Sequence, residues 1–88
     1  MLRILRKKKF DKDVERAKRR KMDMNKLKDV ITHLAKQNPL PTRYKVHALR
    51  SEFFGCKECH IEPDWLLIYY IQDDKLVLVR TGSHSDLF

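Results

Sequence analysis

Two apolar runs separated by a pair of aspartates constrain the fold of this chain more than any other feature. Residues 65–71 read WLLIYYI, residues 76–80 read LVLVR, and Asp73-Asp74 lies between them. Short apolar runs flanking a two-residue polar break are typical of antiparallel strands joined by a tight turn. With the aspartates in the turn, residues of the two strands pair in a fixed register: Gln72 with Lys75, Tyr69 with Leu78, Leu67 with Arg80, Trp65 with Gly82 and Asp64 with Ser83.

Both faces of this predicted hairpin are apolar. Side chains alternate between the faces of a strand, so one face carries Trp65, Leu67, Tyr69, Ile71, Leu76, Leu78 and Arg80. The other face carries Leu66, Ile68, Tyr70, Val77 and Val79. Because the chain has one pair of helices to cover the sheet, we expect the remaining face to meet a partner chain.

The N-terminal part of the chain predicts a strand and two helices. Leu2 and Ile4 alternate with polar residues, which is typical of a short first strand. Apolar residues at helical spacing then predict a helix over residues 12–21. A second helix is expected to begin with Asp23 as its N-cap and to end at Asn38-Pro39.

After the helices, residues 40–51 show no period and predict a loop, and residues 53–61 predict the strand that precedes the hairpin. The expected order is therefore β-α-α-β-β-β. This is an α+β fold in which a mostly antiparallel, twisted sheet packs on an N-terminal helical hairpin. With 88 residues, the chain is long enough for one domain, which we expect to span residues 1–88.

Positive charge is concentrated at the start of the chain. The formal net charge is +8, but residues 1–28 hold thirteen Lys and Arg against four Asp and Glu, whereas residues 29–88 hold seven against eight. A basic stretch of this kind is expected to face a polyanion such as RNA. A solvated helix kept soluble by lysines would have the same composition.

Composition and patterning exclude several other classes of protein. The longest apolar run, residues 65–71, is much shorter than the roughly 20 residues that span a bilayer. The N-terminal residues lack the apolar stretch of a secretory signal, and two cysteines are too few for a disulfide scaffold. We therefore expect a protein of the cytoplasm with no membrane partner.

The predicted register brings polar side chains to one end of the sheet. His60 precedes the short link between two strands, and His84 follows the last strand, so both are expected near Asp64. Arg80 is close by on the last strand, and His47 lies in the preceding loop. The sequence therefore predicts a cluster of histidines with one carboxylate and one guanidinium.

These residue types match the needs of RNA cleavage through the 2′-OH. Histidine exchanges protons near neutral pH, and an aspartate can orient an imidazole or stabilise its protonated form. Arginine binds phosphate through its planar donors. This chemistry needs no metal and no cofactor. Histidines satisfied by solvent or backbone at the rim of a sheet would leave the same pattern.

Cys56 and Cys59 form a C-x-x-C motif beside His60, a spacing found in zinc and redox sites. On a strand, residues three apart point to opposite faces, and the chain has no second cysteine pair. A redox motif of this kind normally opens a helix, and none is predicted here. We therefore expect neither a metal nor a redox role for these cysteines.

The most specific motifs lie in residues 44–88 and read YKVHAL, CHIEPDWLLIYYI and RTGSHSDLF. In these motifs the chain resembles the YafQ branch of the RelE toxin family, and the resemblance extends over essentially the whole chain. It implies a RelE-like fold and a type II toxin that cleaves mRNA without a metal, usually on the ribosome, leaving a 2′,3′-cyclic phosphate. It also implies inhibition by a cognate antitoxin of the DinJ kind, with operator DNA bound only through the toxin–antitoxin complex.

The same resemblance assigns roles to individual positions. The proton-transfer set of YafQ-type toxins corresponds to His47, His60, Asp64 and His84, with acid and base left open. Arg80 corresponds to a phosphate-binding arginine, and Lys57 takes the place of another, keeping the charge without the paired donors. Trp65 and Phe88 correspond to aromatic positions beside the site, where contact with RNA is expected.

Two hypotheses from other classes stay open at this point. A non-catalytic ParE-like toxin that acts on DNA gyrase would share the fold but have no use for the histidines. A basic nucleic-acid-binding module would bind in a salt-sensitive way without cutting the strand.

Overall fold

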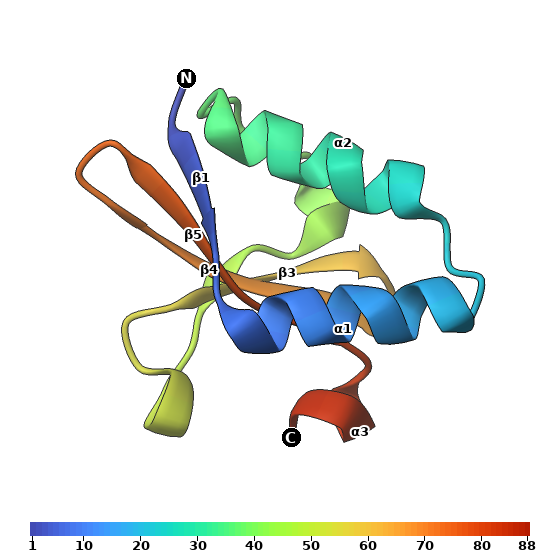
Figure 1. Cartoon of the computed structure of the whole chain (residues 1–88). Helices are drawn as coiled ribbons and strands as arrows, with labels where there is room; N and C mark the ends of the chain where they lie inside the picture. Colours follow the sequence, from blue (N-terminus) through green and yellow to red (C-terminus); the bar gives the residue numbers. More distant parts are fainter.

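One five-stranded sheet organises the computed structural model, which describes all 88 residues. Its strands follow the order β1-β5-β4-β3-β2, and β1 alone is parallel to its neighbour. The two long helices, α1 and α2, lie on one side of the sheet (Figure 1). The strands are β1 (Arg3–Arg6), β2 (His47–Ala48), β3 (Lys57–Glu62), β4 (Trp65–Gln72) and β5 (Lys75–Gly82), and the helices are α1 (Lys8–Arg19), α2 (Met24–Ala35) and α3 (His84–Leu87).

The predicted α+β class is confirmed, and the predicted elements occur in order with two additions. β2 lies in the segment expected to be a loop, and α3 follows the last strand. α1 begins before residue 12 because Phe10, which is 2% exposed, packs into the core from the first turn of the helix. β3 begins after residue 53 because a short 3-10 turn, η2 (Ser51–Phe53), occupies that place. No helix is both long and apolar enough to span a bilayer.

The N-cap predicted for α2 is confirmed. The Asp23 side chain accepts a hydrogen bond from the backbone N–H of Asn25, which satisfies one of the free donors at the start of the helix. Leu27, Val30 and Leu34 of this helix are buried against the sheet. The basic N-terminal stretch thus forms a helical hairpin with one apolar stripe on each helix.

Both faces of the sheet bury apolar side chains. The main core lies between the sheet and the long helices and includes the predicted hairpin residues Trp65, Leu67, Tyr69, Leu76 and Leu78. On the second face, which points away from α1 and α2, Leu66 and Ile68 are fully buried. Leu87 of α3 and the segment 49–56 cover them. The expectation that a partner chain covers this face is therefore wrong at its centre, because the chain covers it itself.

A β-bulge changes the predicted pairing of β4 with β5. The register is as predicted from the turn up to Tyr69 with Leu78, and then it shifts so that Ile68 lies opposite Arg80. The predicted pairs Leu67–Arg80 and Trp65–Gly82 are wrong because β5 holds one extra residue at this point. Arg80 therefore lies on the second face, and the chain beyond β5 is displaced by one position.

Candidate active site

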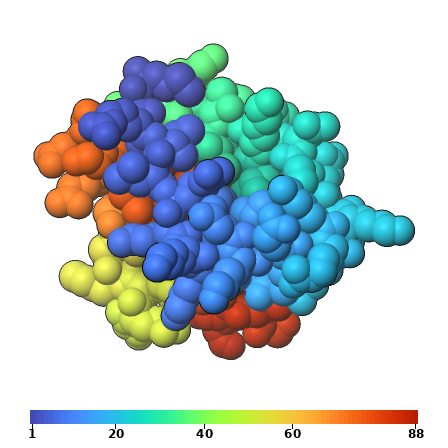
Figure 2. Space-filling view, viewed as in Figure 1, coloured from blue at the N-terminus to red at the C-terminus, as the bar shows by residue number.

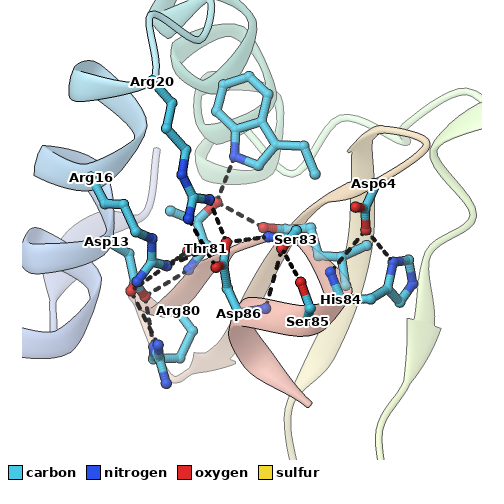
Figure 3. Close-up of polar contacts among 12 residues, drawn as sticks. Asp13, Arg16, Arg20, Asp64, Arg80, Thr81, Ser83, His84, Ser85 and Asp86 are labelled. Atoms are coloured by element: carbon cyan, nitrogen blue, oxygen red, sulfur yellow. Dashed lines mark hydrogen bonds and ion pairs between the residues drawn. The ribbon is translucent and has the colours of Figure 1, made fainter.

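His84 and Asp64 are brought together by the displaced end of β5. His84 is the first residue of α3, which begins with a capping box formed by Ser83 and Asp86. One oxygen of Asp64, Oδ1, accepts hydrogen bonds from the backbone N–H of His84 at 2.8 Å and from its ring Nδ1 at 2.6 Å (Figure 3). Both hydrogen bonds lower the pKa of Asp64, and the bond from the backbone N–H has the larger effect. Because a carboxylate can only accept, Nδ1 carries the proton and Nε2 is left for a substrate.

A second carboxylate lies between the other two histidines. Glu58 of β3 is 5% exposed, and its Oε2 lies 2.8 Å from Nε2 of His47 and 3.6 Å from Nε2 of His60. Nδ1 of His47 also lies 2.8 Å from the carbonyl oxygen of Lys45. The two ring nitrogens of His47 therefore face two oxygen atoms, one from the Glu58 carboxylate and one from the Lys45 backbone.

The three imidazoles form a row on the second face of the sheet. The ring centroids of His47 and His60 are 6.2 Å apart, and those of His60 and His84 are 5.8 Å apart. The structure thus places together all four residues of the proton-transfer set predicted from the sequence. The row thus combines groups that can donate and accept protons with a carboxylate partner at each end.

Glu58 is the residue that the sequence analysis missed. Its signal is its spacing of two from His60 on a strand, which puts both side chains on the same face. His47, Glu58 and His60 also offer one possible ligand atom each, all within 4.8 Å of one another. Imidazole nitrogen and carboxylate oxygen suit Zn²⁺ or Cu²⁺, so these three residues could hold such an ion.

Arg80 is held by a buried carboxylate. Its Nε and Nη2 donate to the two oxygens of Asp13, at 2.6 and 3.1 Å, and Asp13 is 3% exposed. Asp13 also accepts from Arg16 at 2.9 Å and from the backbone N–H of Thr81 at 3.1 Å. The hydrogen bond to Asp13 raises the pKa of Arg80. The guanidinium therefore lies at a fixed place on the second face, with part of its donors already used.

The other predicted RNA contacts differ in outcome. The expected contact of Trp65 is wrong, because the ring is 1% exposed and its N–H donates to Thr81 Oγ1 at 3.0 Å inside the core. Lys57 is not brought to the histidines, because it precedes Glu58 on β3 and so points to the opposite face. Phe88 is 62% exposed and packs edge-on against Phe53, with ring centroids 5.6 Å apart. Phe88 alone of these three is available beside the site.

The two cysteines lie on opposite sides of the sheet, as predicted. Cys59 is buried in the main core, where burial raises the pKa of its thiol to about 12. Cys56 packs against the apolar cluster of the second face. The two thiols therefore cannot coordinate the same metal ion.

Comparison with known proteins decides which family has this site. The model of the family described as "Bacterial toxin of type II toxin-antitoxin system, YafQ" matches residues 2–88. The chain belongs to the YafQ family. The mRNA interferase toxin YafQ of Escherichia coli (strain B / BL21-DE3) is 49% identical over 80 residues, which cover 90% of this chain and 87% of that protein. The family predicted from the sequence motifs is confirmed.

Solved structures of YafQ toxins also share the fold. A chain in the crystal structure of the E. coli DinJ-YafQ complex is 45% identical, with a TM-score of 0.91 over 100% of this chain and 99% of that one. A metal-bound toxin from Helicobacter pylori is 43% identical, with a TM-score of 0.93 over the full length of both chains. The predicted RelE-like arrangement is thus the fold of YafQ toxins.

Proposed function

We propose that this protein is the toxin of a type II toxin–antitoxin system and acts as an mRNA interferase, an endoribonuclease that stops translation. The observation that carries the proposal is the row of three imidazoles on the second face of the sheet, with Asp64 bonded to His84 at one end and Glu58 between His47 and His60. A protein that only blocks a partner has no need for such a row. Membership of the YafQ family, whose relatives include proteins named mRNA interferase toxins, supports the same activity.

Cleavage needs a base for the 2′-OH and an acid for the leaving oxygen. Glu58, with His60 beside it, takes the 2′ proton as the 2′ oxygen attacks phosphorus. His84 gives a proton from Nε2 to the 5′ oxygen as that oxygen leaves, and Asp64 stabilises the imidazolium that exists before this transfer. His47 holds the Glu58 carboxylate in place through the 2.8 Å contact of its Nε2. The products are a 2′,3′-cyclic phosphate and a 5′-OH, and no metal takes part in a step.

The partners follow from the same assignment. The substrate is mRNA, bound on the ribosome, and the inhibitor is a cognate antitoxin of the DinJ kind. A DinJ-YafQ complex is known for a relative that shares 45% of its sequence with this chain. Operator DNA is contacted through the antitoxin complex. The protein works as a single domain, residues 1–88, in the cytoplasm.

Cleavage of a defined mRNA in EDTA, with and without ribosomes, tests the activity. The wild type should cut and leave a cyclic phosphate, whereas His84→Ala should abolish cutting without unfolding the chain, because the His84 side chain is 55% exposed. His33→Ala is the matched control, since His33 is an exposed residue of α2 whose ring contacts the backbone oxygen of Asp29. Folded protein that cuts in neither arm would redirect the search to DNA gyrase or to plain nucleic-acid binding.

A further inference from the structure

A groove beside the histidine row combines an apolar floor with a basic rim. It lies on the second face, between the start of α1, the η2 turn and β5. Figure 2 shows the start of α1 (blue), the segment near residue 53 (yellow) and α3 (red) meeting at this end of the molecule. Phe53, Tyr70, Val79 and Leu87 supply the apolar surface. Lys7, Lys8, Lys9 and Arg80 supply the positive charge, against one carboxylate, Glu52.

The three lysines are exposed and take part in no ion pair, unlike many of the other basic residues near the helices. Arg6 pairs with Asp11, and Lys26 with Glu62. Adjacent ammonium groups without a counter-charge repel one another, and a phosphate placed between them would relieve that repulsion. The three lysines form no ion pair that would stabilise the fold, and their positive charge is therefore available to bind a polyanion.

The floor suits a nucleobase. The Tyr70 and Phe53 side chains are half-buried, so each presents part of its ring to the groove while the rest packs on the sheet. A base can stack on an aromatic side chain whatever its identity. An apolar floor with ammonium groups above it thus matches one nucleotide, base inward and phosphate outward.

The groove continues into the candidate active site. Phe53 lines the groove and also packs against Phe88. The backbone N–H of Phe88 donates to the carbonyl oxygen of His84 at 2.8 Å. A strand of RNA whose phosphate lies at His84 can therefore pass over the Phe88 ring and reach the groove without leaving the second face of the sheet.

We propose that this groove binds a nucleotide of the RNA that flanks the cleaved bond, with its base against Tyr70 and Phe53 and its phosphate on Lys7, Lys8 and Lys9. The site rests on the proposed endoribonuclease function and extends it. The groove holds the strand, and the histidines act on the neighbouring phosphodiester.

Binding and cleavage by two charge-matched triple variants test the groove. Lys7→Ala/Lys8→Ala/Lys9→Ala removes the rim, whereas Lys21→Ala/Lys28→Ala/Lys36→Ala removes the same charge from exposed lysines of the helical hairpin and its end, none of them ion-paired. The first probe is an RNA with a 2′-deoxy nucleotide at the scissile position, which cannot be cut. Compared with the wild type, the rim variant should bind this RNA at least tenfold more weakly, and its affinity should depend less steeply on salt. The control variant should bind it less than threefold more weakly than the wild type.

Substrate length separates binding in the groove from chemistry. A dinucleotide, which cannot reach the groove, should be cut equally by the wild type and the rim variant. With a longer RNA, the rim variant should show a raised KM and an unchanged kcat.

An abasic flanking nucleotide should weaken binding about tenfold in the wild type and not in Tyr70→Leu, which keeps an apolar floor without a ring. Equal losses in the two triple variants, or no loss in either, would overturn the groove. If no RNA is cut with or without ribosomes, yet binding of the uncuttable RNA still needs the rim lysines, the proposed nuclease function fails and the groove stands.

Discussion

Arg20 donates two hydrogen bonds to the carboxylate of Asp86, at 2.7 and 3.2 Å, across 66 residues of chain (Figure 3). Arg20 is the C-cap residue that follows α1, and Asp86 lies in α3, two residues after His84. Asp86 also accepts from the backbone N–H of Ser83 at 2.9 Å, and Arg16 lies 3.7 Å away. A helix of four residues is not stable alone. These contacts therefore decide where α3 holds His84.

Arg20→Ala should lower kcat more than it lowers stability. An ion pair with an arginine that is 48% exposed contributes little to folding because solvent screens it, but a displaced imidazole can cost on the order of 10- to 100-fold in rate. Arg19→Ala is the control, because it removes the same charge from α1 and Arg19 makes no ion pair. Single-turnover rates and thermal unfolding measured side by side give the two effects. Equal rates for both variants would remove Arg20 from the positioning of α3.

Acid should weaken the same contact. The hydrogen bond from Arg20 and the bonds from Ser83 hold the pKa of Asp86 well below its usual range. A carboxyl group with a lowered pKa in the fold stabilises the native state above its unfolded pKa of about 3.9, and this stabilisation is lost as the pH falls. The difference in unfolding free energy between the wild type and Asp86→Asn should therefore shrink between pH 6 and pH 3. Urea titrations followed by the fluorescence of Trp65, the single tryptophan, measure it; a constant difference would contradict it.

The hairpin could be predicted from the sequence, but its bulge could not. The turn at Asp73-Asp74 and the pairs up to Tyr69 with Leu78 follow from local patterning. The bulge depends on Asp13, whose carboxylate accepts from the backbone N–H of Thr81, 68 residues away. No local pattern in β5 indicates that a carboxylate from α1 will bind the backbone of this strand. Yet the bulge is what brings His84, in place of Ser83, to Asp64.

The sequence does not reveal Glu58, and the contact it predicts for Trp65 is wrong, for related reasons. A charged residue within a strand indicates a solvent-facing position, but Glu58 is buried because two imidazoles neighbour it. Trp65 corresponds to an aromatic position beside the site, but its indole N–H finds Thr81 within the core, so the whole ring is covered. Burial depends on partners that lie far away in the sequence, and the pattern of one strand does not contain them.

Glu58→Gln should abolish most of the cleavage and leave RNA binding nearly unchanged. Glutamine keeps the shape of the side chain but cannot take a proton, so the rate should fall on the order of 100-fold or more. Glu62→Gln is the matched control, because Glu62 lies on the same strand and pairs with Lys26, outside the histidine row. Rates on cleavable RNA and affinities for the 2′-deoxy analogue separate the two effects. Full activity in Glu58→Gln would mean that an imidazole alone is the base.

Zn²⁺ or Cu²⁺ should inhibit cleavage, and EDTA should restore it. His47, Glu58 and His60 bring three possible ligand atoms within 4.8 Å of one another, and an ion bound there would block Glu58 and His60, the groups proposed to take the 2′ proton. His47→Ala should weaken metal binding measured by calorimetry, whereas His33→Ala should leave it unchanged because His33 lies on α2. Inhibition of equal strength in both variants would place the ion elsewhere.

The two glycines of the chain offer a final comparison of stability with activity. A Cβ at Gly82 would lie 2.9 Å from Nη2 of Arg16 and 3.0 Å from Cβ of Asp86, so in Gly82→Ala the Arg16 guanidinium must move and Asp86 of α3 must shift by a few tenths of an ångström. A Cβ at Gly55 would meet nothing within 4 Å, but its φ of +91° strains any other residue. Both alanine variants should lose about 1–3 kcal/mol of stability. At a temperature where both are folded, Gly82→Ala should cleave slowly and Gly55→Ala at nearly the wild-type rate. Equal rates would mean that the distance between α3 and α1 does not control His84.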